Sequence, residues 1–181
     1  MANWCEGTLK IRSENKENIL NFIKDSFMDC CHASSSSLDI ASMPAIESGV
    51  LEIDDNDDWI DISLDCKEDH WIHIANCGKS FIELGDFNYY ETSFHPVSRY
   101  YDNSLHSSSV VVFPFKSAWT VDPENWIEAS RKYNVDFRMY GVERNNEFVK
   151  EVEIIKGEVT LDKKIEFDDW DWQCPFPKLG G

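Results

Sequence analysis

The sequence contains no apolar run close to the ~18–20 residues that a membrane-spanning helix needs, although apolar residues make up 42% of its 181 residues. Its first residues also lack the basic segment followed by an apolar one that marks a secretion signal. We therefore expect a chain that does not span a membrane and stays in the cytoplasm. A glycine-rich phosphate-binding loop and a Gly-x-Ser-x-Gly elbow are missing too, so no motif points to nucleophilic catalysis.

Positive charge is scarce. Lysine and arginine together number 17 against 34 aspartates and glutamates, which gives a formal net charge of −17. Such a charge makes binding to nucleic acid phosphates or to an anionic membrane unfavourable unless a metal ion or a segregated basic patch intervenes. It favours a basic partner instead. The alternative is that the acidity only keeps the protein in solution.

Length and composition predict one folded domain. The chain is long enough for a sizeable core, and a second full domain is not expected. Seven tryptophans argue against a disordered acidic chain. The six cysteines lack the regular spacing of a disulfide framework, so we expect reduced thiols, mostly buried as small apolar groups. They are Cys5, Cys30, Cys31, Cys66, Cys77 and Cys174.

The clearest secondary-structure pattern runs from Val110 to Gly141. Residues 110–115 form an apolar run rich in β-branched and aromatic side chains, which predicts a buried strand. Asp122 and Pro123 are typical of a helix start, and Asn134 can end that helix. Alternating apolar residues then predict a strand over 135–139. The order strand, helix, strand predicts a βαβ unit.

The remaining elements are predicted from shorter patterns. A strand is expected from Trp4 to Arg12, followed by a helix from Glu14 to about Phe27 that Ser13 caps. The buried stripe of this helix is expected to consist of Ile19, Leu20, Ile23 and Phe27. Residues 28–48 and 85–109 show little periodicity and are predicted to be loops. A turn at 144–146 should join the preceding strand to strands over 147–155 and 158–167, and the aromatic, acidic tail should pack back on the domain.

An acidic, β-rich region is predicted to be inserted at about 39–91. Short apolar patterns there indicate strands over 50–53, 59–66, 71–76 and 80–84. In the strands 59–66 and 71–76, apolar residues alternate with polar or aromatic ones. The apolar faces coincide if Ile62 pairs with Ile74 and Leu64 with Ile72. We therefore predict that these two strands form a hairpin.

Two segments resemble a known family. M-A-N-W-C-E-G-T-L-K-I at the start and F-P-F-K-S-A-W-T-V-D-P before the second helix look like the YubB/Api92-like proteins of phages and plasmids. The resemblance covers about half of the chain, and the Trp-Gly-Thr-Lys-Trp element common in that family is absent. It implies a ferredoxin-like α+β core, with a mostly antiparallel sheet and two helices packed on one face, encoded on a mobile element in a bacterial host. It implies no defined reaction, so no catalytic residue is carried over.

Negative charge is concentrated in the inserted region. From Asp39 to Glu91 there are fourteen carboxylates against two lysines, a local net charge of −12. On the predicted hairpin, these carboxylates would share the outward face with Trp59 and Trp71. Spaced negative charges with flat rings between them can imitate a nucleic acid. The alternative is a solvated strand face without a partner. We predict a partner-binding surface formed by Asp54, Asp55, Asp57, Asp58, Trp59, Asp61, Asp65, Trp71 and His73.

A basic groove that normally holds nucleic acid would fit such a surface. We therefore predict an acidic anti-defence protein that binds the groove of a host RNA-guided CRISPR nuclease, with or without its guide RNA, but not free DNA. Such nucleases hold their heteroduplex in a positively charged channel. The size and acidity of the chain also resemble those of several anti-CRISPR proteins. The alternatives are a metal-dependent nuclease or nucleotide hydrolase, and a soluble accessory module of mobile elements with no inhibitory role.

Three patterns contain residue types that can bind a metal ion. D-D-N-D-D-W, residues 54–59, resembles a calcium loop but lacks its glycine and its final glutamate. Cys66-x3-His70-x2-His73-x3-Cys77 has the residue types of a zinc site, but strand alternation points Cys66 inward and His73 outward. Asp168, Asp169 and Asp171 could hold Mg²⁺, although acidic tails usually have no such role. We predict no metal, no cofactor and no catalytic residue.

Overall fold

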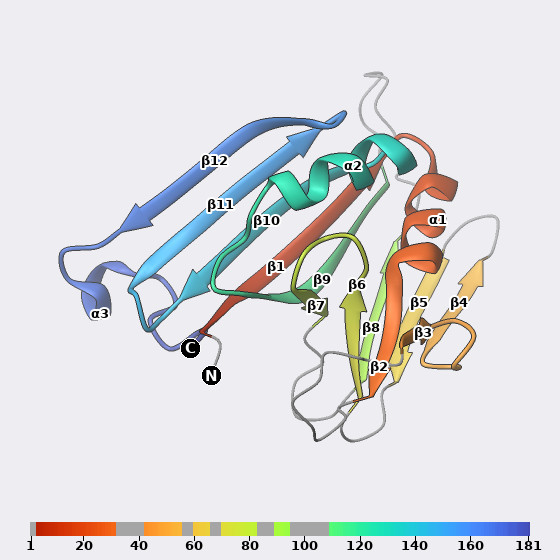
Figure 1. The fold of residues 1–181 in the computed structure, drawn as a ribbon, viewed down its shortest axis with the longest axis horizontal. Coiled ribbons are helices and arrows are strands. Elements are labelled where there is room, and N and C mark those ends of the chain that lie inside the picture. The colour runs from red at the N-terminus through yellow and green to blue at the C-terminus, as the bar shows by residue number, and fades with distance from the viewer. Residues whose placement is uncertain (1–2, 32–41, 56–59, 66–69, 83–88, 95–108) are drawn as a thin grey trace, which may run out of the picture.

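The computed structural model describes residues 3–31, 42–55, 60–65, 70–82, 89–94 and 109–181 (Figure 1). Within these residues the strands form a nine-stranded sheet of order β12-β11-β10-β1-β9-β7-β6-β2-β3 and a three-stranded sheet of order β4-β5-β8. Every pair of neighbouring strands in these two sheets is antiparallel. In chain order the elements are β1 (Trp4–Ser13), α1 (Lys16–Ser26), β2 (Phe27–Cys31), β3 (Ser42–Pro44), β4 (Leu51–Asp55), β5 (Ile60–Asp65), β6 (His70–Ile74), β7 (Ser80–Ile82), β8 (Tyr89–Phe94), β9 (Ser109–Ala118), α2 (Glu124–Tyr133), β10 (Asp136–Glu143), β11 (Phe148–Ile155), β12 (Glu158–Glu166) and α3 (Trp170–Gln173).

The predicted fold class, a ferredoxin-like α+β core with two packed helices, is wrong. The described chain is mostly β, and its helices span only 11, 10 and 4 residues. The expected insertion is divided between the two sheets: β4 and β5 belong to the smaller sheet, whereas β7 pairs with β9 and β6 pairs with both β7 and β2. The strands β7, β6, β2 and β3 therefore continue the larger sheet beyond β9.

The helix α1 begins two residues later than predicted, at Lys16 and not at Glu14. Its N-cap is Asn15, whose side-chain oxygen accepts a hydrogen bond from the Glu17 N–H at 3.0 Å. Ser13 instead ends β1, and its hydroxyl donates to the Asn134 carbonyl at 3.0 Å. The expected buried stripe of Ile19, Leu20, Ile23 and Phe27 is confirmed, and Phe22 is buried as well.

The helix α2 follows the sequence prediction closely. Asp122 Oδ1 accepts a hydrogen bond from the Glu124 N–H at 3.1 Å, and Asn134 ends the helix in the left-handed conformation with φ 51°. The strands on either side of the helix, β9 and β10, each pair antiparallel with β1. They are therefore parallel to each other but not adjacent, because β1 lies between them.

Aromatic side chains join both helices to the nine-stranded sheet. Phe137 of β10 contacts Phe22 of α1 and Trp126 of α2, each at 5.0 Å between ring centroids. Trp126 also contacts Phe115 of β9 at 5.9 Å. All four side chains are buried and belong to one core cluster, which includes Ile60, Ile62 and Leu64 of the smaller sheet. The smaller sheet therefore packs on the same core as the helices.

The hairpin predicted to join residues 59–66 and 71–76 is wrong. Ile62 lies opposite Ile53 of β4 and Thr92 of β8, whereas Ile72 lies opposite Asp29 of β2 and Ile82 of β7. Alternation determines which face of a strand is buried but not which strand lies beside it. Two of the real partners, β2 of β6 and β8 of β5, lie almost entirely in segments that were predicted to be loops. With these partners missing from the prediction, the two alternating strands appeared to pair with each other.

The C-terminal part is confirmed in outline. The strands β11 and β12 form a hairpin, and Lys156 and Gly157 at its turn both have positive φ, 52° and 72°, as tight hairpin turns require. The tail packs back through Trp170 and Cys174, which form a second buried cluster with Val142 and Val149.

Candidate partner-binding surface

The three-stranded sheet has one buried face and one acidic face. Along β5, Ile60, Ile62 and Leu64 are completely buried, while the residues between them face outward and are half-buried or exposed. The alternation that predicted an apolar and a polar face for this strand is therefore confirmed. We use the name acidic sheet face for the four outward carboxylates of β4 and β5: Glu52, Asp54, Asp61 and Asp65.

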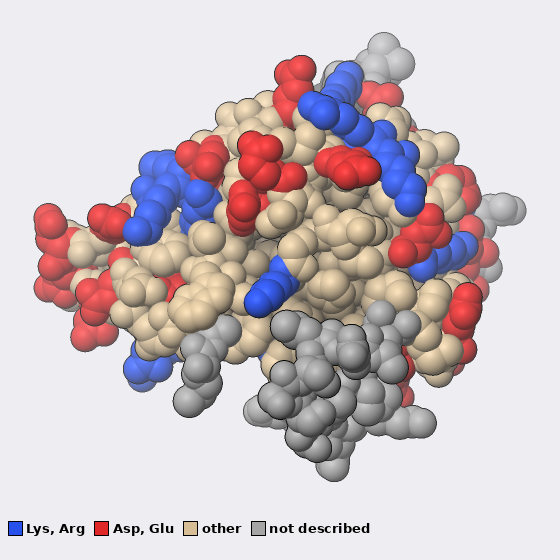
Figure 2. Space-filling view, viewed as in Figure 1, with Lys and Arg blue, Asp and Glu red and all other residues tan. Residues whose placement is uncertain are grey.

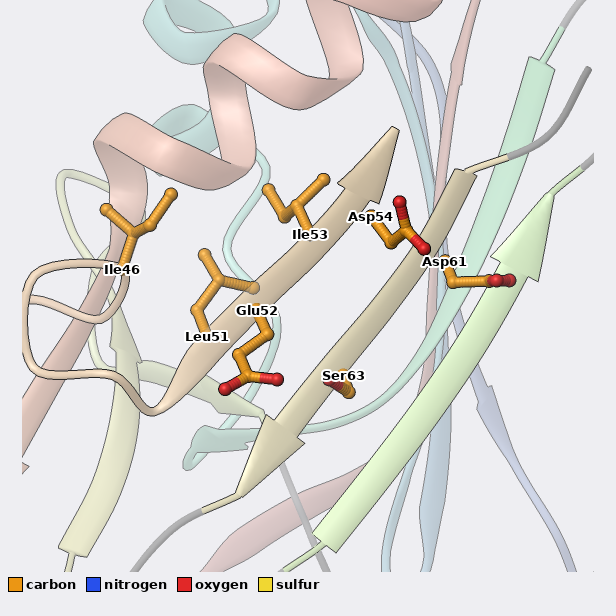
Figure 3. A pocket seen from close by; sticks show the side chains of 7 residues that line it. All are labelled: Ile46, Leu51, Glu52, Ile53, Asp54, Asp61 and Ser63. Atoms are coloured by element: carbon orange, nitrogen blue, oxygen red, sulfur yellow. The ribbon is translucent and has the colours of Figure 1, made fainter. Parts of the chain in front are cut away.

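A shallow pocket of about 500 Å³ lies at this sheet (Figure 3). In Figure 3 its carboxylates and Ser63 lie on one side of the β4–β5 pair, and its apolar side chains point toward α1. The pocket therefore sets negative charge beside apolar surface, an arrangement that suits a long cationic side chain with an aliphatic stem. It is lined by Ile46, Leu51, Glu52, Ile53, Asp54, Asp61 and Ser63.

Two carboxylates of the acidic sheet face lie directly opposite each other. Asp54 of β4 is paired in register with Asp61 of β5, and Figure 3 shows their side chains next to one another. Like charges at directly opposite positions of an antiparallel pair destabilise it, typically by about 0.2–1 kcal/mol. The two carboxylates concentrate negative charge at this point of the sheet, which favours binding of positive charge.

Asp55, a predicted member of the partner-binding surface, also forms a contact within the chain. Its carboxylate forms an ion pair with Lys16 Nζ at 2.9 Å, which links the end of β4 to the first turn of α1. This ion pair helps to fix the position of β4 relative to α1. Asp57, Asp58 and Trp59 lie outside the described residues.

Trp71 and His73 do not share a surface with these carboxylates. Both lie on β6, in the nine-stranded sheet. Trp71 packs edge-on against Trp4 and Phe81, and Lys116 Nζ lies 4.3 Å from its ring centre. His73 Nε2 lies 2.9 Å from the Gly78 carbonyl oxygen. The predicted combination of carboxylates and Trp71 on one hairpin is therefore not formed, because that hairpin does not exist.

None of the three metal patterns forms a cluster within the described residues. No group of three or more His, Cys, Asp or Glu side chains there is placed to hold a metal ion. Cys77 is buried in the core, while Cys66 and most of the calcium-like loop lie outside the described residues. In the tail, Asp169 caps α3 by accepting a hydrogen bond from the Trp172 N–H at 3.2 Å.

Two buried thiols are expected to resist alkylation. Burial raises the pKa of Cys5 and of Cys77 to about 12, and the thiolate is the reactive form. At mildly alkaline pH, iodoacetamide should therefore leave both residues unmodified in the native protein and modify them readily in urea. Peptide mapping by mass spectrometry measures this. Equal labelling rates with and without urea would contradict the burial of these side chains.

Trp119 directly follows β9 and was not predicted as a special residue, although the segment F-K-S-A-W-T is distinctive in the sequence. Trp119 has φ 71°. The residues on either side of it are joined by a hydrogen bond of 2.9 Å from the Thr120 N–H to the Ala118 carbonyl. This is the pattern of a γ-turn with positive φ, a rare and strained conformation for a bulky residue. The backbone is held there by the Trp119 N–H, which donates to the Asn3 carbonyl at 2.7 Å.

The strain at Trp119 predicts an unusual order of stability. Trp119→Ala and Trp119→Gly both remove the exposed ring, but only glycine adopts positive φ without steric cost. We expect the glycine variant to have a free energy of unfolding about 1 kcal/mol higher than the alanine variant. Urea unfolding measures the difference. At an ordinary strand position the glycine variant would be less stable than the alanine variant. A Trp119→Gly protein less stable than Trp119→Ala would therefore show that the turn is not strained.

The chain matches no family model, no curated protein and no solved structure in the comparisons made. The resemblance to YubB/Api92-like proteins therefore stays a prediction. In the part of the chain that the structure describes, no helix combines the length and the apolar character needed to cross a membrane.

Proposed function

We propose that this protein is an acidic interaction protein that binds the basic nucleic-acid groove of another protein. The target that we propose is a host RNA-guided CRISPR nuclease in a bacterial cytoplasm, so that the protein acts as an anti-defence inhibitor. The observation that carries the proposal is the acidic sheet face, where Asp54 and Asp61 oppose each other beside a shallow pocket.

The charge of the whole chain supports a basic partner. A net charge of −17 creates a field that attracts positively charged surfaces over distances of about a Debye length, ~10 Å at moderate salt. RNA-guided nucleases offer such a surface in the channel that holds their guide–target duplex. Binding in that channel would exclude the nucleic acid and block the nuclease.

The proposed contact residues are a revised set. Glu52, Asp54, Asp61 and Asp65 share one face of the smaller sheet and are its core members. Asp57, Asp58 and Trp59 join β4 to β5 in the sequence and stay predicted members. Trp71 and His73 are removed from the set because they lie on the other sheet.

The test is a binding and inhibition experiment with purified components. The protein is immobilised and offered a purified RNA-guided nuclease, with and without guide RNA, at low and high salt. We expect capture at low salt that weakens steeply as salt rises, and loss of DNA binding by the captured nuclease. Capture of a nuclease that still binds guide and DNA normally would rule out inhibition. Cleavage of nucleic acid by the purified protein alone with Mg²⁺ or Mn²⁺ would favour the nuclease alternative.

A further inference from the structure

The short helix α3 presents two tryptophans in opposite ways. Trp170 is 8% exposed and its indole N–H donates to the Pro177 carbonyl at 3.0 Å, whereas Trp172, two residues later, is 86% exposed. Exposed apolar residues are common singly. A tryptophan exposed to this degree on an ordered helix is a different case, because tryptophan is the side chain most enriched at the energetic centres of interfaces.

The local structure holds Trp172 in place. Asp169 caps the helix through the Trp172 N–H, and Gln173 Oε1 accepts hydrogen bonds from the Asp168 and Asp169 N–H groups at 3.1 and 3.3 Å. The buried ring of Trp170 anchors the helix to Val142 and Val149 of the sheet. The indole of Trp172 is therefore presented from a rigid base, which lowers the entropy lost on binding.

Carboxylates surround the exposed indole in the sequence. We use the name α3 surface for Asp168, Asp171 and Trp172, all of which are exposed. Figure 2 shows Asp and Glu side chains gathered at the end of the molecule where Figure 1 places α3. An anionic partner would be repelled there, and a purely apolar partner would have to bury unpaired carboxylates at a high cost.

We propose that the α3 surface is a second binding site, separate from the acidic sheet face, and that it binds an arginine-containing segment of a partner protein. A guanidinium group can stack on the indole ring and form two parallel hydrogen bonds with a carboxylate. The ammonium group of lysine is more strongly hydrated and acts as a point charge. The site is therefore expected to prefer arginine to lysine, whereas charge attraction alone treats them alike.

The test compares two peptides of equal length, an oligo-arginine and an oligo-lysine, by calorimetric titration of the full chain. We expect the native protein to bind the arginine peptide about fivefold more tightly, and Trp172→Ala to remove that preference. Trp172→Phe, which keeps a ring with a weaker cation–π interaction, should be intermediate. The matched control is Val159→Ala, which truncates another exposed apolar residue at the far end of β12 and should leave the preference unchanged.

Each outcome decides the proposal. A preference for arginine that survives in Trp172→Ala, or equal binding of the two peptides by the native protein, would overturn it. Asp61→Asn on the acidic sheet face should weaken both peptides equally, so a failure of the α3 surface can be distinguished from a failure of the proposed function. Because Trp172 is exposed, unchanged thermal unfolding of its variants is expected and excludes misfolding as the cause.

Discussion

The double variant Asp54→Lys/Asp61→Lys is expected to weaken binding to the basic target by at least about tenfold at low salt. Both substitutions reverse the charge at the centre of the acidic sheet face, where the two side chains oppose each other. The partner's cations would then meet lysines in place of carboxylates. The measurement is a binding titration against the captured nuclease, repeated at high salt, where the difference between the two proteins should shrink because surface charges are screened.

One pair of like charges replaces another, so the repulsion between these two positions stays similar in size. The matched control is Glu147→Lys/Glu158→Lys, which changes the net charge by the same amount at two exposed positions of the β10–β11 turn and β12. If both double variants lost affinity equally, only net charge would matter and the acidic sheet face would have no special role.

Trp126→Ala is expected to lower the free energy of unfolding by about 3–5 kcal/mol, as is typical for large aromatic residues removed from a core. Trp126 is 1% exposed and packs against Phe115 and Phe137. Its removal therefore leaves a cavity between α2 and the two strands that flank β1. Since small domains have only about 5–15 kcal/mol of stability, the variant should unfold at a much lower urea concentration.

The control for this prediction is the neighbouring residue. Ile127 is half-buried on the same helix and is not a member of the buried core cluster of the described residues. Ile127→Ala removes side-chain atoms from the same helix without opening a cavity in the core, so its effect should be clearly smaller. Equal unfolding midpoints for the two variants would mean that α2 does not pack on the sheet through Trp126.

Much of the local structure was readable from the residues. The alternation in β5 and β6 correctly identified their buried faces, and Asp122 with Asn134 marked the two ends of α2. These features depend on side chains and backbone groups within a few residues of each other, so a sequence pattern contains them. The cap of α1 was placed at Ser13 rather than Asn15 because both residue types can accept the hydrogen bond.

The candidate site was only partly predictable. Three carboxylates of the acidic sheet face, Asp54, Asp61 and Asp65, were predicted, and Glu52 was not. Asp61 and Asp65 follow from the pattern alone, because they hold outward positions on an alternating strand. Trp71 was placed beside them in error, and Trp172 was overlooked, although D-D-W-D-W is conspicuous in the sequence. Nothing in that repeat of tryptophan and aspartate indicates which ring is buried. The exposure of Trp172 depends on Trp170 finding a pocket against Val142 and Val149.

The sequence by itself determined the acidic charge, the buried faces of most strands and the boundaries of α2, because each is a property of composition or of neighbouring residues. Only the tertiary structure decided that β6 joins the large sheet while β5 joins the small one. Strand neighbours are chosen by packing and hydrogen bonding between segments far apart in the chain, such as β2 with β6. A pattern that repeats every two residues is identical for each possible neighbour, so it contains no information about that choice.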